Sequence, residues 1–443
     1  MQAHRAAILW FDPRADAPAP CYEADGLLLL APDPQGVQRV QAVGAYRELR
    51  AQYPDVPVQH HPGRLIAPGF VDLHIHYPQT DVIGSPAEGL LPWLEHYTFP
   101  HESRFADPAY AGEVAEFFLD ELRRQGVTTA LTFATSHPGS VDALMERAWA
   151  RGLRLVAGKV LQDRHSPDGV RDQTAQSLVD TETLIGRWHG RGRLGYAITP
   201  RFAPSCSDAQ MRGAGELAAR HPDVWVQSHV AENLDEVRWV RELYPQARSY
   251  LGVYADFGLL RERALYAHCI HLDDTDRALL RDTGAAAAVS PTSNLFLGSG
   301  FFDHASADRV GFRYGLASDV GGGTSFSPFH TMLAAYYVGR ASVTGSGSAK
   351  TGQSLAPSHL WWQHTAGAAR AMGLDGVVGS LAPGSEADWL LLNPQATPLL
   401  ARRVAQAQHL EELLFAYIVL GDDRAVERVS VAGAATDGVL HGG

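Results

Sequence analysis

The sequence predicts a (β/α)8 TIM-like barrel carried between two β-rich ends. Its middle part alternates short apolar, β-rich runs with amphipathic stretches, and this alternation is typical of parallel strands joined by helices. We count eight such units within about 300 residues, which is the size of one closed barrel.

Each expected strand is a short apolar run rich in β-branched and small residues. The eight runs are 69–75, 128–134, 154–161, 194–199, 224–230, 264–269, 285–290 and 312–318. Two of the intervening helices have clear ends. The stretch 107–125 opens with Asp107 as an N-cap and Pro108 in its first turn, and the stretch 272–283 stops at Gly284.

The two ends of the chain resemble each other in composition. Residues 1–67 and 377–443 carry short apolar runs broken by Pro and Gly, which favours strands. Neither end is long enough to bury a core alone. We therefore expect a small β-sandwich domain built from both termini beside a barrel of residues 68–376. The stretch 345–352 (GSGSAKTG) is expected to form a loop.

Composition excludes several classes of protein. A chain of 443 residues with 45% hydrophobic and 19% charged residues is typical of a soluble globular enzyme, and its net charge of −12 disfavours a nucleic-acid partner. Three cysteines without a CxxC pair indicate a reducing compartment. The apolar run 413–420 is too short to span a bilayer, and the N-terminal residues show no signal-peptide pattern. We therefore expect a cytoplasmic protein with no membrane partner.

Five polar residues stand at or just after the ends of expected strands. They are His74, His76, His229, His268 and Asp319. Barrel enzymes place their catalytic groups at the carboxyl ends of strands, and side chains two apart on a strand share a face. Imidazole and carboxylate are ligands that zinc and ferrous iron accept. The pattern predicts a metal-dependent hydrolase site.

This order of residues resembles the amidohydrolase superfamily over nearly the whole chain. Its binuclear members commonly carry a carboxylated lysine at the fourth strand, where this chain reads ITPRF, so the resemblance implies one metal ion per chain. We expect zinc, and ferrous iron fits the same ligands. By this resemblance the metal ligands are His74, His76, His229 and Asp319. His268 instead hydrogen-bonds the water that the metal activates.

Seven segments resemble the guanine deaminase family more closely. They are HIHYPQ (74–79), LPWLEHYTFP (91–100), TPRFAPSCS (199–207), QSHVAEN (227–233), AHCIHL (267–272), SPTSNLFLGSG (290–300) and SDVGGGTSFS (318–327). The resemblance implies hydrolysis of guanine to xanthine and ammonia, in purine catabolism or salvage, by a homodimer. It also implies that Glu232 is the catalytic acid and base and that Gln79, Arg201 and Phe202 contact guanine, next to His76 and His229.

The chemistry of the reaction suits these residues. A bound divalent metal lowers the pKa of water to about 7 and so supplies hydroxide for attack at C2. Glu232, three residues after His229, can carry the proton to N3, while His268 and Asp319 orient the hydroxide. Arg201 donors suit the O6 and N7 acceptors of guanine, Gln79 can both donate and accept, and Phe202 can stack on the ring.

Other interpretations stay open at this point. A related deaminase acting on 8-oxoguanine, a pterin or ammeline would share the metal ligands, although Gln79 and the Arg201–Phe202 pair favour guanine. An inactive metal-binding scaffold is disfavoured because every ligand and Glu232 are present, and the motif of the small nucleic-acid deaminases is absent. Glu232 could instead be a first-turn acid of a helix. The residues without a settled role are Trp93, Tyr97, Phe99, Asn294 and Ser325.

Overall fold

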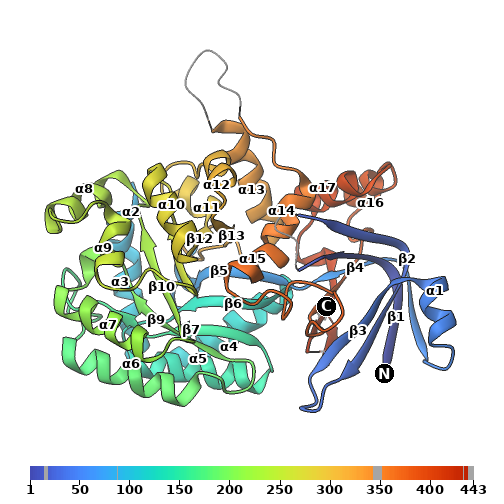
Figure 1. Ribbon diagram of the computed structural model, residues 1–443, viewed down its shortest axis with the longest axis horizontal. Helices are drawn as coiled ribbons and strands as arrows, with labels where there is room; N and C mark the ends of the chain where they lie inside the picture. The colour runs from blue at the N-terminus through green and yellow to red at the C-terminus, as the bar shows by residue number, and fades with distance from the viewer. Residues whose placement is uncertain (14–17, 87, 343–351, 433, 438–443) are drawn as a thin grey trace.

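The computed structural model describes residues 1–13, 18–86, 88–342, 352–432 and 434–437. Most of the expected loop 345–352 lies outside these residues. Figure 1 shows a barrel with a second sheet beside it, and that sheet contains strands from both ends of the chain. Within the described residues, no helix is both long enough and apolar enough to cross a bilayer.

The barrel strands lie in sequence order, each parallel to its neighbour. They are β5 (Phe70–His76), β6 (Val127–Phe133), β7 (Arg154–Gly158), β9 (Gly195–Pro200), β10 (Trp225–Val230), β11 (Ala264–His268), β12 (Ala286–Val289) and β13 (Arg313–Leu316). The predicted strand 154–161 is divided into β7 and the short β8 (Val160–Leu161). The ladder is interrupted at Lys159, whose backbone N–H donates to the Tyr196 hydroxyl instead.

The barrel closes between its first strand and the segment that follows its last strand. The Asp319 N–H donates to the His74 carbonyl at 2.8 Å, and the His76 N–H donates to the Val320 carbonyl at 2.9 Å. Both bonds lie at the carboxyl end of β5. The closure therefore brings two sequence-distant parts of the candidate site together.

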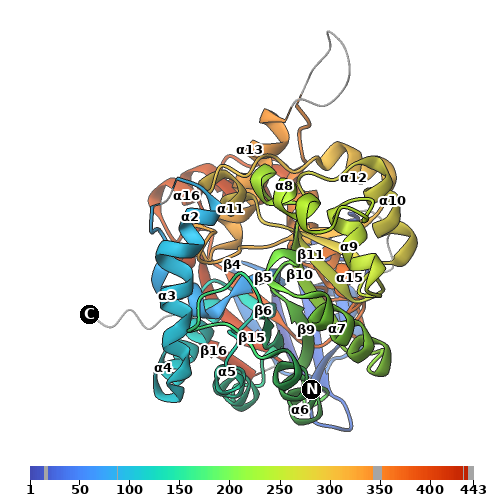
Figure 2. The ribbon, with the colours of Figure 1, turned by 90° about the vertical axis from the view of Figure 1, so that its left-hand side faces the viewer.

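Helices surround the strands, as Figure 2 shows for α4 to α7 and for α10 and α13. The helices of the barrel are α4 (Pro108–Arg124), α5 (Pro138–Ala150), α6 (Thr174–Trp188), α7 (Asp208–Arg220), α8 (Leu234–Leu243), α9 (Tyr250–Asp256), α10 (Asp274–Thr283), α11 (Pro291–Phe296), α12 (His304–Val310), α13 (Pro328–Ala341), α14 (Pro357–Gln363) and α15 (Ala366–Ala371). Asp107 caps α4 through the Ala109 N–H, as predicted. Gly284 ends α10 with a left-handed φ of 74°.

The connection after β5 is built of short helical turns. It contains the 3-10 turn η1 (Tyr77–Val82), α2 (Leu90–Trp93), the π-helical turn η2 (Leu94–Thr98), α3 (Phe99–Glu102) and the 3-10 turn η3 (Ser103–Ala106). Leu90, Trp93, Leu94 and Phe99 are buried in one apolar cluster. These side chains pack together with Val170 and Leu297 from other connections, and the connection forms one side of the pocket described below.

Strands from both termini form one seven-stranded sheet in the order β16-β15-β14-β4-β1-β2-β3. They are β1 (Gln2–Phe11), β2 (Pro20–Pro32), β3 (Gln38–Ala45), β4 (Val58–Pro68), β14 (Trp389–Leu392), β15 (Val426–Val431) and β16 (Ala434–Asp437). The strands from the two ends of the chain meet where β4 pairs antiparallel with β14. The predicted fold class is confirmed, and the domain boundaries after residues 67 and 376 stay a prediction.

The C-terminal part also contains helices that the sequence patterns did not indicate. They are α16 (Pro398–Val404) and α17 (Leu410–Leu420). A further short helix, α1 (Tyr46–Gln52), lies near the other end of the chain. The apolar run 413–420 belongs to α17, which packs against α13 and α14 of the barrel. Its hydrophobicity therefore serves the contact between the two parts of the molecule.

A buried ion network joins the terminal sheet to the barrel. Arg193, just before β9, donates to Glu386 at 2.8 Å and also pairs with Asp388. Arg154, at the start of β7, donates to the same Glu386 at 3.1 Å. Burial opposes the ionisation of Glu386, but the two guanidinium groups hold its pKa below the usual value. Glu386 thus stays charged and paired at neutral pH.

We expect Arg193→Ala to lower the free energy of unfolding by about 3–5 kcal/mol, because it leaves two buried carboxylates short of a partner. The shift of the urea denaturation midpoint measures this loss. The metal content of the folded variant should equal that of the wild type, since the network lies outside the pocket. A loss below about 1 kcal/mol, the scale of an exposed ion pair, would contradict the assignment.

Candidate active site

Four of the predicted residues converge at the carboxyl end of the barrel. His74, His76, His229 and Asp319 each offer a ligand atom, and these atoms all lie within 4.8 Å of one another. Asp319 Oδ1 is 3.0 Å from His74 Nε2 and 3.3 Å from His76 Nε2, and His76 Nε2 is 3.3 Å from His229 Nε2. Zinc bonds of about 2.0–2.1 Å in tetrahedral geometry require ligand atoms about 3.3 Å apart. The cluster therefore fits a single metal ion.

The imidazoles are held in the form that binds a metal. His229 Nδ1 donates a hydrogen bond to the Arg201 carbonyl at 2.6 Å. The lone pair of Nε2 therefore faces the cluster. Burial lowers the pKa of His76 to about 4 and holds the pKa of His229 well below its usual value. Both rings are therefore neutral near pH 7, as metal ligands must be.

Phe133 supports the three imidazoles from one side. It is the last residue of β6, and its ring centroid lies 4.9, 4.6 and 4.9 Å from those of His74, His76 and His229. The sequence analysis did not identify Phe133. The position of Phe133 at the end of a strand could have indicated that it belongs to the site, but apolar residues at strand ends are common in any barrel.

Asp319 is positioned by an unusual stretch of backbone. Its φ is +52°, a left-handed value that costs energy in a residue other than glycine and is frequent at functional sites. The chain then passes so close to its neighbours that a Cβ at Gly323 would lie 1.7 Å from the Ser318 carbonyl oxygen. Burial opposes the ionisation of Asp319, but the imidazoles around it hold the pKa of its carboxyl well below the usual value.

His268 lies beside the cluster rather than in it. Its Nδ1 is 2.8 Å from Asn294 Oδ1, so Nδ1 donates, and its Nε2 faces Glu232 Oε2 at 3.3 Å and Asp319 Oδ2 at 3.8 Å. Asn294, which had no role in the sequence analysis, therefore fixes the ring of His268. Ser325 accepts a hydrogen bond from the Ser327 N–H just before α13.

Glu232 is buried between His268 and Ser299, whose hydroxyl donates to Glu232 Oε1 at 3.0 Å. It precedes Asn233, the N-cap of α8, so it is not a first-turn acid of that helix. Burial, with the negative charge of Asp319 adding to it, raises the pKa of Glu232 to about 8. A carboxyl group with such a pKa can both take up and release a proton near neutral pH.

A second buried glutamate fixes the backbone of the first. Glu236 Oε2 accepts from the backbone N–H groups of Glu232 at 3.0 Å and Asn233 at 3.2 Å, and Glu236 Oε1 accepts from the Tyr250 hydroxyl at 2.6 Å. Asn233 and Glu236 together form a capping box. The spacing N-x-x-E before a helix is the signal that could have predicted this contact.

One pocket is lined by three of the four clustered residues, by Glu232 and by the predicted substrate contacts. Its polar and aromatic walls include His76, Gln79, Arg201, Phe202, His229, Glu232, His268 and Asp319, and its apolar side includes Leu90, Trp93, Leu94 and Leu297. Of the three aromatic residues left open, Trp93 lines this pocket. Phe99 lies beneath Arg201, with 5.0 Å between the guanidinium carbon and the ring centroid, and Tyr97 packs against the apolar cluster of Trp93.

Glu102 is a site residue that the sequence analysis missed. Its carboxylate is fully buried and accepts hydrogen bonds from both Gln79 and Arg201. It belongs to the irregular connection after β5, where no strand end or helical period marks a position as facing the site. The match of residues 91–100 to the guanine deaminase family stops two positions before it.

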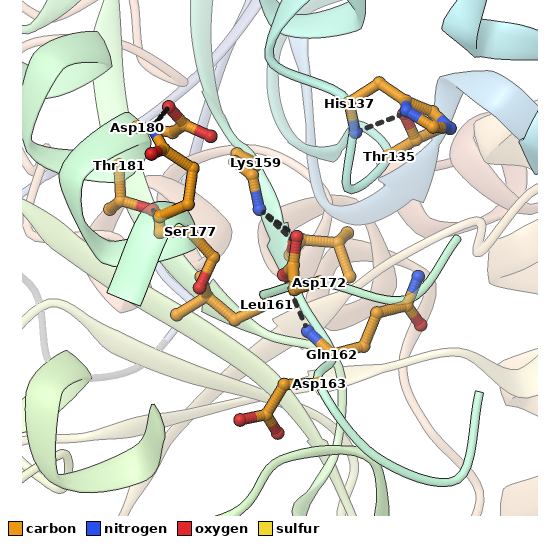
Figure 3. Close-up of polar contacts among 12 residues, drawn as sticks. Thr135, His137, Lys159, Leu161, Gln162, Asp163, Asp172, Ser177, Asp180 and Thr181 are labelled. Atoms are coloured by element: carbon orange, nitrogen blue, oxygen red, sulfur yellow. Dashed lines mark hydrogen bonds and ion pairs between the residues drawn. The ribbon is translucent and has the colours of Figure 1, made fainter. Parts of the chain in front are cut away.

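A buried ion pair secures the loop after β7. Figure 3 shows Lys159 reaching Asp172, at 2.7 Å, and Asp172 accepting in turn from the backbone of Gln162. The Gln162 side chain donates to the Val170 carbonyl at 3.1 Å. Val170 packs in the apolar cluster that contains Trp93. The pair thus supports the outer side of the pocket without reaching into it.

Comparison with known proteins agrees with this geometry. Residues 65–436 match the model of the amidohydrolase family. The chain belongs to the amidohydrolase family. It is 42% identical to the guanine deaminase of Escherichia coli (strain K12) over 95% of this chain and 93% of that protein. The structure of E. coli guanine deaminase matches with a TM-score of 0.93 over 98% of this chain and 99% of that chain. The predicted resemblance is therefore confirmed.

Two further solved structures match over 98% of this chain. Guanine deaminase from C. acetobutylicum, with guanine bound in its active site, is 29% identical with a TM-score of 0.89 and is covered over 99% of its length. An adenosine deaminase from Xanthomonas campestris with bound zinc is 20% identical with a TM-score of 0.83 and is covered over 92%. The second of these supports the fold alone.

We expect the purified protein to hold one divalent ion per chain, measured by elemental analysis. Asp319→Ala should lose most of the ion, because it removes the only anionic group of the four-residue cluster. His268→Ala should keep it, because His268 lies outside that cluster. Two tightly bound ions per chain, or a wild-type protein without metal after growth in metal-replete medium, would contradict a single-ion site.

Proposed function

We propose that the chain is a guanine deaminase, a hydrolase that converts guanine and water to xanthine and ammonia. The observation that carries the proposal is the single pocket in which Gln79 and Arg201 face the same space as Glu232 and the His–Asp cluster. The 42% identity to the E. coli guanine deaminase supports it. Purine catabolism or salvage is the proposed context.

We assign His74, His76, His229 and Asp319 as ligands of one zinc ion, with ferrous iron as the alternative. Neutral imidazoles and a carboxylate are ligands that both metals accept, and their ligand atoms lie at suitable separations. When bound, the ion supplies hydroxide near neutral pH by lowering the pKa of water.

Glu232 is the proposed proton carrier. It takes a proton from the attacking water and delivers it to N3 of the ring as the C2–O bond forms. It then moves the second water proton to the amine, so that the C2–N bond breaks and ammonia leaves. A pKa of about 8 suits a group that must both hold and release a proton. His268 and Ser299 contact its two carboxylate oxygens and fix their direction.

A second part of the pocket lining, which contains Arg201, Gln79 and Phe202, orients the ring. Arg201 and Gln79 present N–H groups, which suit the O6 and N7 acceptors of guanine. Phe202 is buried in the same wall and offers a ring face for stacking. The rings of His76 and His229 line the same pocket. These contacts favour guanine over a pterin or ammeline, which would use the same metal ligands.

An ammonia-release assay of the metal-loaded protein tests the proposal. The substrates are guanine, 8-oxoguanine, pterin, ammeline, adenine and cytosine, and guanine should give the highest kcat/KM. A higher kcat/KM for another ring would replace guanine as the substrate. Release from none of them would leave no support for deamination of these rings.

We expect Glu232→Gln to keep the metal and the fold but to lose about 10²–10⁴-fold in kcat, because an amide cannot carry a proton between water and N3. Metal content and the thermal midpoint should match the wild type. Glu386→Gln is the matched control, since it makes the same change in a buried glutamate outside the pocket and should leave kcat unchanged. Near-normal turnover by the Glu232 variant would show that the proton carrier is another group.

We expect Arg201→Ala to lower kcat/KM for guanine by about 2–4 kcal/mol, the scale for a lost buried charged hydrogen bond. It should also destabilise the fold, because Glu102 then stays buried without its guanidinium partner. Adding Glu102→Ala should recover part of the stability but not the activity. A single variant within twofold of wild-type kcat/KM would place Arg201 outside substrate contact.

We also propose a homodimer and a cytoplasmic location, which rest on the resemblance and on the composition. Sedimentation analysis of the purified protein and fractionation of the cells that make it would test them. A monomer at micromolar concentration, or recovery of the activity outside the cytoplasm, would contradict these two proposals without affecting the assigned chemistry.

A further inference from the structure

Glu102 lies behind the pocket wall that faces the substrate space. It ends α3 and is fully buried, and it is not among the residues that line the pocket. The two side chains that connect it to the pocket are Gln79 and Arg201, which are 2% and 3% exposed. A buried carboxylate needs hydrogen-bonded partners, and here both partners are proposed substrate contacts.

The hydrogen bonds of Glu102 use a defined part of the donors in this wall. Arg201 Nη1 donates to Glu102 Oε2 at 2.6 Å, and Arg201 Nη2 donates to Oε1 at 3.1 Å. Gln79 Nε2 donates to the same Oε1 at 3.0 Å. A guanidinium has five N–H donors and an amide has two, so donors remain on both groups after these bonds.

The orientation of the Gln79 amide is fixed from both ends. Its Nε2 faces the Glu102 carboxylate, and its Oε1 accepts from the Gly321 N–H at 3.2 Å. A flipped amide would place an oxygen against a carboxylate and an N–H against an N–H. Because both partners oppose the flip, the amide oxygen is held on Gly321 and the free N–H of Nε2 is the group left for a ligand.

The carboxylate also balances the charge of the wall. The Arg201 guanidinium is permanently protonated, and its two-point pairing with Glu102 is the geometry that arginine favours. A neutral ring can then enter without leaving an unpaired charge in a buried place. Removal of the carboxylate charge would free both the guanidinium and the amide to reorient.

We propose that Glu102 is a positioning residue that determines which ring edge the pocket accepts. By holding Gln79 and Arg201 with their remaining N–H groups toward the pocket, it makes the wall a set of donors only. Such a wall binds a purine with a 6-oxo group and rejects one with a 6-amino group, because donors would then face donors. This inference rests on the proposed function, since it concerns the same pocket.

The test is the change in ligand preference in Glu102→Gln. Dissociation constants for hypoxanthine (6-oxo) and adenine (6-amino) are measured by calorimetry on the metal-loaded protein, so turnover is not needed. The ratio of the adenine constant to the hypoxanthine constant should fall about tenfold or more relative to wild type, since a site built for one hydrogen-bonding group loses its discrimination when the partners can turn. The kcat/KM for guanine should fall as well.

Glu386→Gln is the matched control. It makes the same substitution in a buried glutamate that pairs with arginines, but outside the pocket. It should lower the free energy of unfolding and leave the ratio of the adenine to the hypoxanthine dissociation constant unchanged. If Glu102 has a purely structural role, the dissociation constants for adenine and hypoxanthine rise together in Glu102→Gln and their ratio does not change. That result would overturn the inference.

Glu102→Asp keeps the test decisive if the glutamine variant does not fold. Aspartate retains the charge but is one methylene shorter, so it cannot hold both partners at once. The ratio of the adenine to the hypoxanthine dissociation constant should fall about threefold relative to wild type, less than in Glu102→Gln. An unchanged ratio would overturn the inference. If the wild type binds hypoxanthine over adenine but releases no ammonia from guanine, the proposed function fails, and the ratio in the Glu102 variants still decides the role of Glu102.

Discussion

The closure of the barrel is the constraint on which the candidate site depends. Three of the four clustered groups come from the exit of β5 and the segment after β13, the first and last strands of the barrel. The backbone bond from Asp319 to the His74 carbonyl sets their separation. Asp72 adds to it, because its buried carboxylate accepts from the backbone N–H groups of both His74 and Ser318. The separation of these candidate ligands is thus set by hydrogen bonds of the backbone that carries them.

Around this junction, His268, Glu232 and the clustered imidazoles are each held by a neighbouring residue to which no chemical step is assigned. Asn294 turns His268, Ser299 holds Glu232, and Phe133 packs on the imidazoles. Asn294 lies in α11, Ser299 in the connection after α11, and Phe133 at the end of β6. Asn294 holds His268 through Nδ1, which leaves Nε2 facing Glu232 and Asp319.

The sequence predicted the strand-end residues well and the supporting residues poorly. His74, His229 and Asp319 could be found because each follows an apolar strand, and strand ends in a barrel meet at one face. Glu102 and Ser299 lie in irregular connections, where neither a period of two nor one of 3.6 indicates which way a side chain points. The helices α16 and α17 were not predicted for a related reason, because the short apolar runs between Gly and Pro in residues 377–443 favour strands.

Arg201 joins the two halves of the site through different atoms. Its backbone carbonyl accepts from His229 Nδ1 and thereby orients a proposed metal ligand, while its side chain pairs with Glu102 in the wall that faces the ring. A substitution at this position changes the side chain and leaves the carbonyl in place. Ring recognition can therefore be altered here without altering the ligand geometry. The backbone at this strand end thus supports a proposed metal ligand, while the side chain belongs to the proposed contact with the ring.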